Sequence, residues 1–261
     1  MGGRFVWYDL MTTDPSGAKA FYSEVVGFGL QPFEGDPSYE MWMAAQSAIG
    51  GVNQLPKDAL DMGAVPHWLG YVSVDDVDAT AQKAVALGGQ LYVPPTDIPG
   101  VGRFAVFAGP DGAVISAFRS VTPGEGEGEM VVDRGHVVWN ELMAGDLDQA
   151  WAFYTELFGW HQVSTMQMGE AGGEYRMYGP PGAEGMLGGM MTKPPMVPVA
   201  HWLYYFHVDD VSAAAQRARD NGGQIHTGPM QIPGGEWVAI GFDPQGGAFA
   251  VHSKVNAAAE A

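Results

Sequence analysis

The chain has 261 residues, and its 12 lysines and arginines against 30 aspartates and glutamates give a formal net charge of −18. So acidic a chain disfavours nucleic acid and anionic membranes as partners, because both require a basic surface. It contains no cysteine, which excludes thiol catalysis, disulfides and cysteine-ligated metal centres. There is no signal-peptide pattern and no run of about 18 apolar residues, so we expect a cytoplasmic protein without a membrane span.

The first elements alternate between strand and helix patterns. Phe5–Met11 alternates as a strand does, and Asp14 then stands at the N-cap position of a helix that begins with Pro15 and ends at Gly27. Two further strands are predicted, over Tyr39–Ala44 and Ala48–Gln54.

The same order follows in the next stretch of chain. His67–Val74 is predicted as a strand and Asp76–Leu87 as a helix. Strands are then expected over Gln90–Val93, Arg103–Ala108 and Ala113–Arg119. The segment Tyr92–Gly102 and its later counterpart Thr227–Glu236 are rich in proline and glycine, and we predict loops there.

The second half of the chain repeats the first. Val6–Phe28 aligns with Val138–Trp160 with 11 of 23 positions identical, and His67–Leu91 aligns with His201–Ile225 with 15 of 25 identical. Such self-similarity indicates a tandem duplication.

An alternation of glycine and glutamate separates the two copies, and such a segment cannot build a core. We therefore predict a first domain over 1–121, a linker over 122–133, a second domain over 134–256 and a tail over 257–261. Each domain is expected to hold two β-α-β-β-β units, so the fold class is α+β with curved, mostly antiparallel sheets.

The ordered motifs resemble one family. Asp14…Phe21-Tyr22…Gly27-Phe28, His67…Val74-Asp75-Asp76-Val77 and Pro110-Asp111-Gly112 are similar to motifs of the vicinal oxygen chelate superfamily, which includes glyoxalase I, bleomycin-resistance proteins and extradiol dioxygenases. The tandem arrangement most resembles two-domain glyoxalase-like proteins. The resemblance implies four βαβββ modules whose concave sheet faces hold the functional site.

The resemblance also implies positions for the ligands of a divalent metal, which members of the family bind with His, Glu or Gln side chains. In this sequence those positions hold no carboxylate or imidazole: they are Trp7, Leu69 and Ser116 in the first copy, and Trp139, Leu203 and Ala250 in the second. We therefore expect no metal site and no cofactor.

One acidic residue and one histidine in each copy are candidates for a shifted site. Strand side chains alternate, so Asp9 and His67 are expected to face the first cavity, and Glu141 and His201 the second. A carboxylate and an imidazole suit acid–base or ligand-orienting work, whereas a catalytic zinc usually has three protein ligands. The alternative is that these groups satisfy one another, or backbone groups, within a polar core.

Large apolar residues fall on or beside the predicted strands. Aromatic walls with flexible methionines suit a planar or apolar ligand, although the same residues could simply form core. The candidates for lining a ligand site are Trp7, Met41, Trp42, Trp68, Leu69, Ser116, Trp139, Met177, Trp202 and Leu203. His207, His226 and His252 are present only in the second copy, and we interpret them as surface or locally satisfied groups.

Three functions remain open. The first is metal-independent binding of a small apolar or aromatic molecule, for which bleomycin resistance is the family precedent. The second is a lyase, isomerase or oxygenase that uses a shifted metal site or the Asp–His and Glu–His pairs; a divalent metal enters only here. The third is a structural or protein-binding module. The sequence is equally compatible with a monomer whose domains pair and with a homodimer.

Overall fold

The structure is a computed structural model that describes residues 2–122, 132–169 and 173–259. Residues 123–131 of the predicted linker and residues 260–261 of the predicted tail lie outside the described residues. Among the helices of the described part, none is long and apolar enough to cross a membrane.

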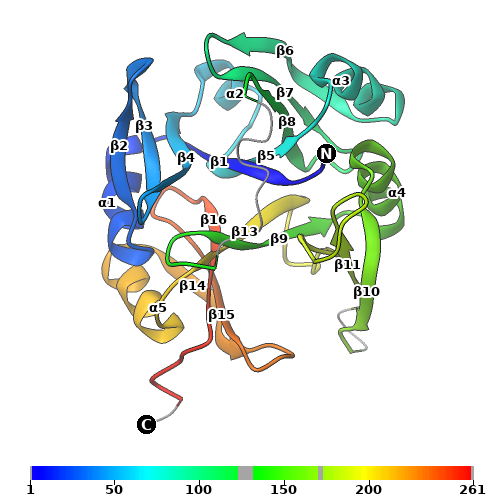
Figure 1. The fold of residues 1–261 in the computed structure, drawn as a ribbon. Helices are drawn as coiled ribbons and strands as arrows, with labels where there is room; N and C mark the ends of the chain where they lie inside the picture. Colours follow the sequence, from blue (N-terminus) through cyan, green and yellow to red (C-terminus); the bar gives the residue numbers. More distant parts are fainter. Residues whose placement is uncertain (1, 123–131, 170–172, 260–261) are drawn as a thin grey trace. The chain divides into compact units, whose positions relative to one another are not determined.

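Each half of the chain folds as two βαβββ modules (Figure 1). Module 1 consists of β1 (Phe5–Thr12), α1 (Pro15–Val25), β2 (Gly29–Phe33), β3 (Asp36–Ala44) and β4 (Ser47–Gln54). The short helix α2 (Lys57–Asp61) leads to module 2, which consists of β5 (His67–Ser73), α3 (Val77–Ala86), β6 (Gln90–Ile98), β7 (Gly102–Ala108) and β8 (Val114–Ser120).

The second half follows the same order. Module 3 consists of β9 (Val137–Ala144), α4 (Leu147–Phe158), β10 (His161–Gln167), β11 (Glu174–Gly179) and β12 (Gly188–Thr192). Module 4 consists of β13 (His201–His207), α5 (Val211–Asp220), β14 (Gln224–Gln231), β15 (Trp237–Phe242) and β16 (Ala248–Ser253).

The strands form two eight-stranded mixed sheets, in the orders β2-β3-β4-β1-β5-β8-β7-β6 and β10-β11-β12-β9-β13-β16-β15-β14. In every module the first strand pairs in parallel with the last, and the three later strands pair antiparallel with one another. The predicted α+β class with four βαβββ modules is therefore confirmed.

An aspartate begins each main helix. The Asp14 side chain accepts a hydrogen bond from the backbone N–H of Gly17 at 3.0 Å, and Pro15 is the first residue of α1, as predicted. Asp76, Asp146 and Asp210 cap α3, α4 and α5 in the same way. The repeated cap fixes where each chain segment turns from strand to helix.

The modules group into two compact units. Unit 1 comprises the described residues within Met1–Trp7, Leu69–Glu129 and Trp139–Trp202, which are most of modules 2 and 3. Unit 2 comprises those within Tyr8–Trp68, Met130–Val138 and Leu203–Ala261, which are most of modules 1 and 4. Each unit therefore draws on both copies of the repeat.

In unit 2, helices α1 and α5 lie side by side (Figure 1). The ring of Phe21 packs edge-on against Phe249 with centroids 5.5 Å apart. The buried hydroxyl of Tyr22 donates to Asp243 Oδ2 at 2.9 Å and accepts from Trp68 Nε1 at 2.9 Å. Burial raises the pKa of Tyr22, which keeps the phenol protonated as a donor.

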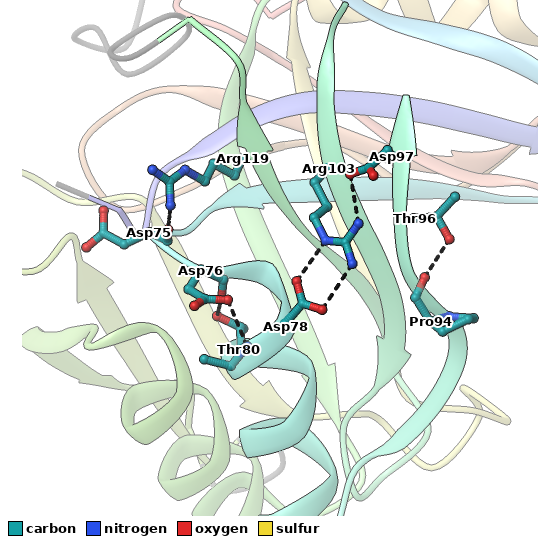
Figure 2. Close-up of polar contacts among 10 residues, drawn as sticks. Asp75, Asp76, Asp78, Thr80, Pro94, Thr96, Asp97, Arg103 and Arg119 are labelled. Atoms are coloured by element: carbon teal, nitrogen blue, oxygen red, sulfur yellow. Dashed lines mark hydrogen bonds and ion pairs between the residues drawn. The ribbon is translucent and has the colours of Figure 1, made fainter. Parts of the chain in front are cut away.

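In unit 1, helix α3 packs against α4, and Phe107 of β7 stacks with Phe158 of α4. Arg103 holds the start of α3 against the sheet: its guanidinium donates to both oxygens of Asp78 and to Asp97 (Figure 2). These ion pairs are exposed, so they contribute little stability.

Candidate functional site

In module 1, a tyrosine crosses the sheet to reach an acidic side chain. The registers Asp9↔Gly51 and Met41↔Gly51 place these residues side by side on the sheet face away from α1. The Tyr39 hydroxyl donates to Asp9 Oδ1 at 2.6 Å, a short, charge-assisted distance. A Cβ at Gly51 would come within 2.0 Å of the Tyr39 hydroxyl, so the phenol passes directly over a position without a side chain.

Module 3 repeats this arrangement. The Tyr175 hydroxyl donates to Glu141 Oε2 at 2.9 Å and accepts from Trp139 Nε1 at 2.6 Å. A Cβ at Gly189 would meet the Tyr175 ring at 2.2 Å. Tyr175 and Glu141 are both buried, at 6% and 7% exposure. We refer to Trp139, Tyr175, Glu141 and Gly189 as the module 3 array, and to Asp9, Tyr39 and Gly51 as the module 1 array.

Methionines surround both arrays. Met177 pairs with Gly189, and Met143 and Met191 are paired neighbours on the same face of module 3. In module 1, Met41 pairs with Gly51 and Met11 lies two residues beyond Asp9. Methionine fills irregular gaps because its side chain is flexible and polarisable. Each array therefore presents a few polar groups among flexible apolar side chains.

His67 and His201 do not bond to the carboxylates with which the sequence analysis paired them. The Nδ1 atom of His67 lies 2.7 Å from the carbonyl of Val65, and that of His201 lies 3.1 Å from the carbonyl of Val199. Burial lowers the pKa of both imidazoles, more than these carbonyls raise it. Each ring is therefore neutral near pH 7, donates through Nδ1 and keeps Nε2 as an acceptor.

Three of the candidate tryptophans lie in aromatic clusters on the helix side of the sheets. Trp42 is fully buried against Tyr22 and Phe28. Trp68 donates to the hydroxyl of Tyr22, and Trp202 packs edge-on against Tyr154 with centroids 5.2 Å apart. These three tryptophans therefore form core on the helix side of the sheets. By strand alternation, Met41, Met177 and Trp139 lie on the opposite face.

The positions at which the family binds a metal carry no ligand side chains. Trp7 and Trp139 hold the first position, and the buried Leu69 and Leu203 hold the second. At the third position Ser116 donates its hydroxyl to the carbonyl of Ala105 at 2.9 Å, and the second copy has Ala250. Within the described residues, no three His, Asp or Glu side chains could hold a cation together. These residues do not fit the divalent metal that the family implies.

Tyr39 and Tyr175 were not among the residues predicted from the sequence. Both stand two residues before a methionine that was predicted, Met41 and Met177, and each faces a glycine of a recurring Gly-Gly pair. Glycine within a strand indicates close approach of another group. That signal was visible in the sequence, but it does not say which side chain approaches.

The duplicated modules, paired into eight-stranded sheets, define a class of tandem βαβββ proteins. A model of the Glyoxalase/Bleomycin resistance protein/Dioxygenase superfamily matches residues 4–116 and again residues 134–251. The chain belongs to this superfamily, as its motifs predicted.

Among curated relatives, the chain is 37% identical over 249 residues to "Putative glyoxylase CFP32" of Mycobacterium bovis, covering 94% of this chain and 92% of that protein. It is 28% identical over 266 residues to the anthracycline biosynthesis protein DauV of Streptomyces sp. (strain C5), covering 95% and 92%.

Solved structures share the fold at low identity. The Mn(II)-bound glyoxalase from Novosphingobium aromaticivorans matches with a TM-score of 0.65 at 17% identity, covering 98% of this chain and 85% of that one. The 2,3-dioxygenase LapB from Pseudomonas sp. KL28 matches with a TM-score of 0.63 at 12% identity, covering 97% and 92%.

Proposed function

We propose that the protein binds a small, largely apolar or aromatic molecule without a metal, on the sheet faces that carry the module 1 and module 3 arrays. The observation that carries this proposal is the hydrogen-bonded chain Trp139–Tyr175–Glu141, in which Tyr175 and Glu141 are buried and which lies over Gly189 on a methionine-lined face. Small-molecule sites typically combine an apolar lining with a few fixed polar groups, and this face has that composition.

The polar groups favour a ligand that bears a hydroxyl group. A phenol both donates and accepts, and a carboxylate accepts. The single O–H of Tyr175 is donated to Glu141, so a ligand hydroxyl can join the chain by donating to the carboxylate of Glu141. The relative DauV carries anthracycline biosynthesis in its name, and anthracyclines are planar, hydroxylated polycyclic aromatics. This supports an aromatic, hydroxyl-bearing ligand.

A catalytic role is the second candidate, because two observations favour it. His67 and His201 are half-buried, neutral imidazoles with an accepting Nε2, the state that a general base requires near pH 7. A relative at 37% identity carries the name "Putative glyoxylase CFP32". In this case the histidines would take a proton from the bound molecule, and the tyrosine–carboxylate pairs would orient it.

Binding can be tested with a hydroxylated planar probe, 1,4-dihydroxyanthraquinone, by quenching of tryptophan fluorescence. We expect saturable binding that Tyr175→Phe weakens about 2- to 12-fold, since the variant removes the hydrogen bond that holds Glu141 in place, and a net hydrogen bond contributes about 0.5–1.5 kcal/mol. The double variant Tyr39→Phe/Tyr175→Phe should bind more weakly still. The matched control is Tyr92→Phe, which changes an exposed tyrosine on β6.

Elemental analysis of the purified protein accompanies this titration. Stoichiometric divalent metal, or binding of the probe that is unchanged in the double variant, would contradict metal-independent binding at these arrays. Consumption of the probe that His67→Ala and His201→Ala abolish would favour the catalytic candidate.

A further inference from the structure

Module 4 contains a chain of three titratable side chains that its counterpart in the first copy lacks. His207, at the end of β13, pairs in register with His252 of β16, and Glu236 immediately precedes β15. The Nδ1 atoms of the two histidines are 3.3 Å apart, and His252 Nε2 lies 3.0 Å from Glu236 Oε2. The three groups therefore form one connected chain on one face of the module.

The order of donors along this chain follows from its acidic end. An ionised carboxylate only accepts hydrogen bonds, so His252 donates to Glu236 through Nε2–H. A neutral His252 then has a lone pair on Nδ1, which accepts from Nδ1–H of His207. That leaves Nε2 of His207 as the accepting end of the chain, on a side chain that is only half-buried.

The first copy shows that the fold does not require these residues. At the equivalent positions module 2 has Ser73, Phe118 and Gly102, with Ser73 paired to Phe118 in the same register. A Cβ at Gly102 would meet the Phe118 ring at 2.7 Å, so an aromatic ring covers the place where Glu236 stands in module 4. This backbone therefore also accommodates residues that form no such hydrogen-bonded chain. The hydrogen bonds among His207, His252 and Glu236 are specific to the second copy.

We infer that Glu236, His252 and His207 form a base in module 4 that takes the proton of a ligand with a weakly acidic hydroxyl group, namely a phenol or an enol. The ligand's O–H bond breaks, its oxygen keeps the electron pair, and the proton forms a bond to Nε2 of His207. The positive charge is stabilised through His252 by the carboxylate of Glu236. The ligand is held as an anion beside an imidazolium.

Other charged groups near His207 affect the pH range over which its imidazole can accept a proton. Asp209 and Glu236 favour its protonation, while His252 and Lys254 oppose it, and Asp209 is itself paired with Arg134 at 3.0 Å. Burial is the largest effect and lowers the pKa of His207, so the ring is neutral near pH 7 and able to accept a proton.

The first test measures which ring nitrogens carry protons, by long-range ¹H–¹⁵N NMR of the intact protein. We expect His252 as the Nε2–H tautomer and His207 as the Nδ1–H tautomer. In Glu236→Gln, the tautomers of His252 should become mixed, because an amide can donate as well as accept. If His252 of the wild-type protein carries its proton on Nδ1, the assigned order of hydrogen bonds from His207 through His252 to Glu236 is wrong.

The second test uses 4-nitrophenol, whose ionised form absorbs visible light. We expect binding to wild-type protein to lower the apparent pKa of the probe by about one unit, the shift expected for a neighbouring cation. His207→Ser, which installs the residue of the first copy, should abolish that shift, and Glu236→Gln should reduce it. The control is His226→Ala, a histidine that packs against Phe242 instead.

The outcomes separate this inference from the proposed function. A shift lost in His207→Ser but kept in Tyr175→Phe supports the module 4 base, even if the module 3 array binds nothing. A shift that is kept in His207→Ser, or wild-type protein that neither binds nor ionises the probe, would overturn the inference.

Discussion

The lack of a side chain at Gly189 allows the ring of Tyr175 to lie across strand β12. Gly189→Ala would place a methyl group about where that ring now stands, since the added Cβ meets ring atoms at 2.2 Å. We expect the free energy of unfolding to fall by about 1–3 kcal/mol, as for other overpacked cores, and the contact between Tyr175 and Glu141 to be lost. Urea denaturation measures the first effect.

A second strand glycine provides the control for this change. At Gly29 of β2, the nearest atom to an added Cβ is Met43 Cβ at 3.3 Å, a contact that a small shift relieves. Gly29→Ala should therefore change the free energy of unfolding by no more than about 0.5 kcal/mol. If Gly189→Ala and Gly29→Ala lower the free energy of unfolding equally, the effect at Gly189 does not come from its contact with Tyr175.

The half-buried histidines His67 and His201 make the free energy of unfolding depend on pH. The pKa of His67 and that of His201 are lowered from 6.5 in the folded protein, chiefly by burial, so the unfolded chain binds more protons below that value. Their stabilising contribution is present above pH 6.5 and is lost as the pH falls through the folded-state pKa values. Urea denaturation at several pH values between about 8 and 5 should show this fall. The double variant His67→Gln/His201→Gln should show a shallower one, and an unchanged slope would contradict the assignment.

At the scale of single elements, local sequence signals predicted the helices well. Asp14 and Asp76 each accept a hydrogen bond from the N–H three residues on, as the expected caps do. Capping depends on residues close together in the chain, so the sequence contains all the information required.

Strands that contain proline were harder to predict. Tyr92–Gly102 was predicted as a loop, and this was wrong: β6 continues to Ile98 through Pro94 and Pro95, with register shifts between Val93 and Thr96. β2, which contains Pro32, was missed, and the predicted loop at Thr227–Glu236 is strand as far as Gln231. All three are edge strands, where a missing N–H breaks no ladder, and position in the sheet is not a local property.

The candidate site shows the same division between local and non-local information. Strand alternation singled out Asp9 and Glu141 as side chains that face the cavities. The tyrosines that bond to them are about 30 residues further along, on strands whose register the sequence does not give. Side-chain partners across a sheet become visible only when the strands are paired.

At the scale of the molecule, the repeat in the sequence and the packing of the modules divide the chain differently. The repeat predicts one domain over 1–121 and another over 134–256, whereas each compact unit combines modules from both copies. In unit 2, Tyr22 of the first copy donates to Asp243 of the second, and Arg217 donates to the backbone carbonyl of Glu24. The core around Tyr22 is therefore completed by residues about 220 positions later.

This arrangement predicts how separated copies behave. A fragment of residues 1–121 retains Phe21 and Tyr22, which are at most 2% exposed in the whole chain, but loses Phe249 and Asp243, which help to cover them. We expect either fragment alone to unfold at a lower temperature than the whole chain, with a Tm that depends on concentration, because only self-association can replace the missing partner. Mixing the fragments 1–121 and 134–256 should restore a 1:1 complex with a Tm near that of the intact protein, measured by circular dichroism and gel filtration. As a control, cleavage of the intact chain at a protease site inserted between residues 122 and 133 should leave the Tm almost unchanged. Monomeric fragments that each unfold cooperatively at the Tm of the whole chain would show that the copies fold independently, contrary to the packing of Tyr22 and Asp243.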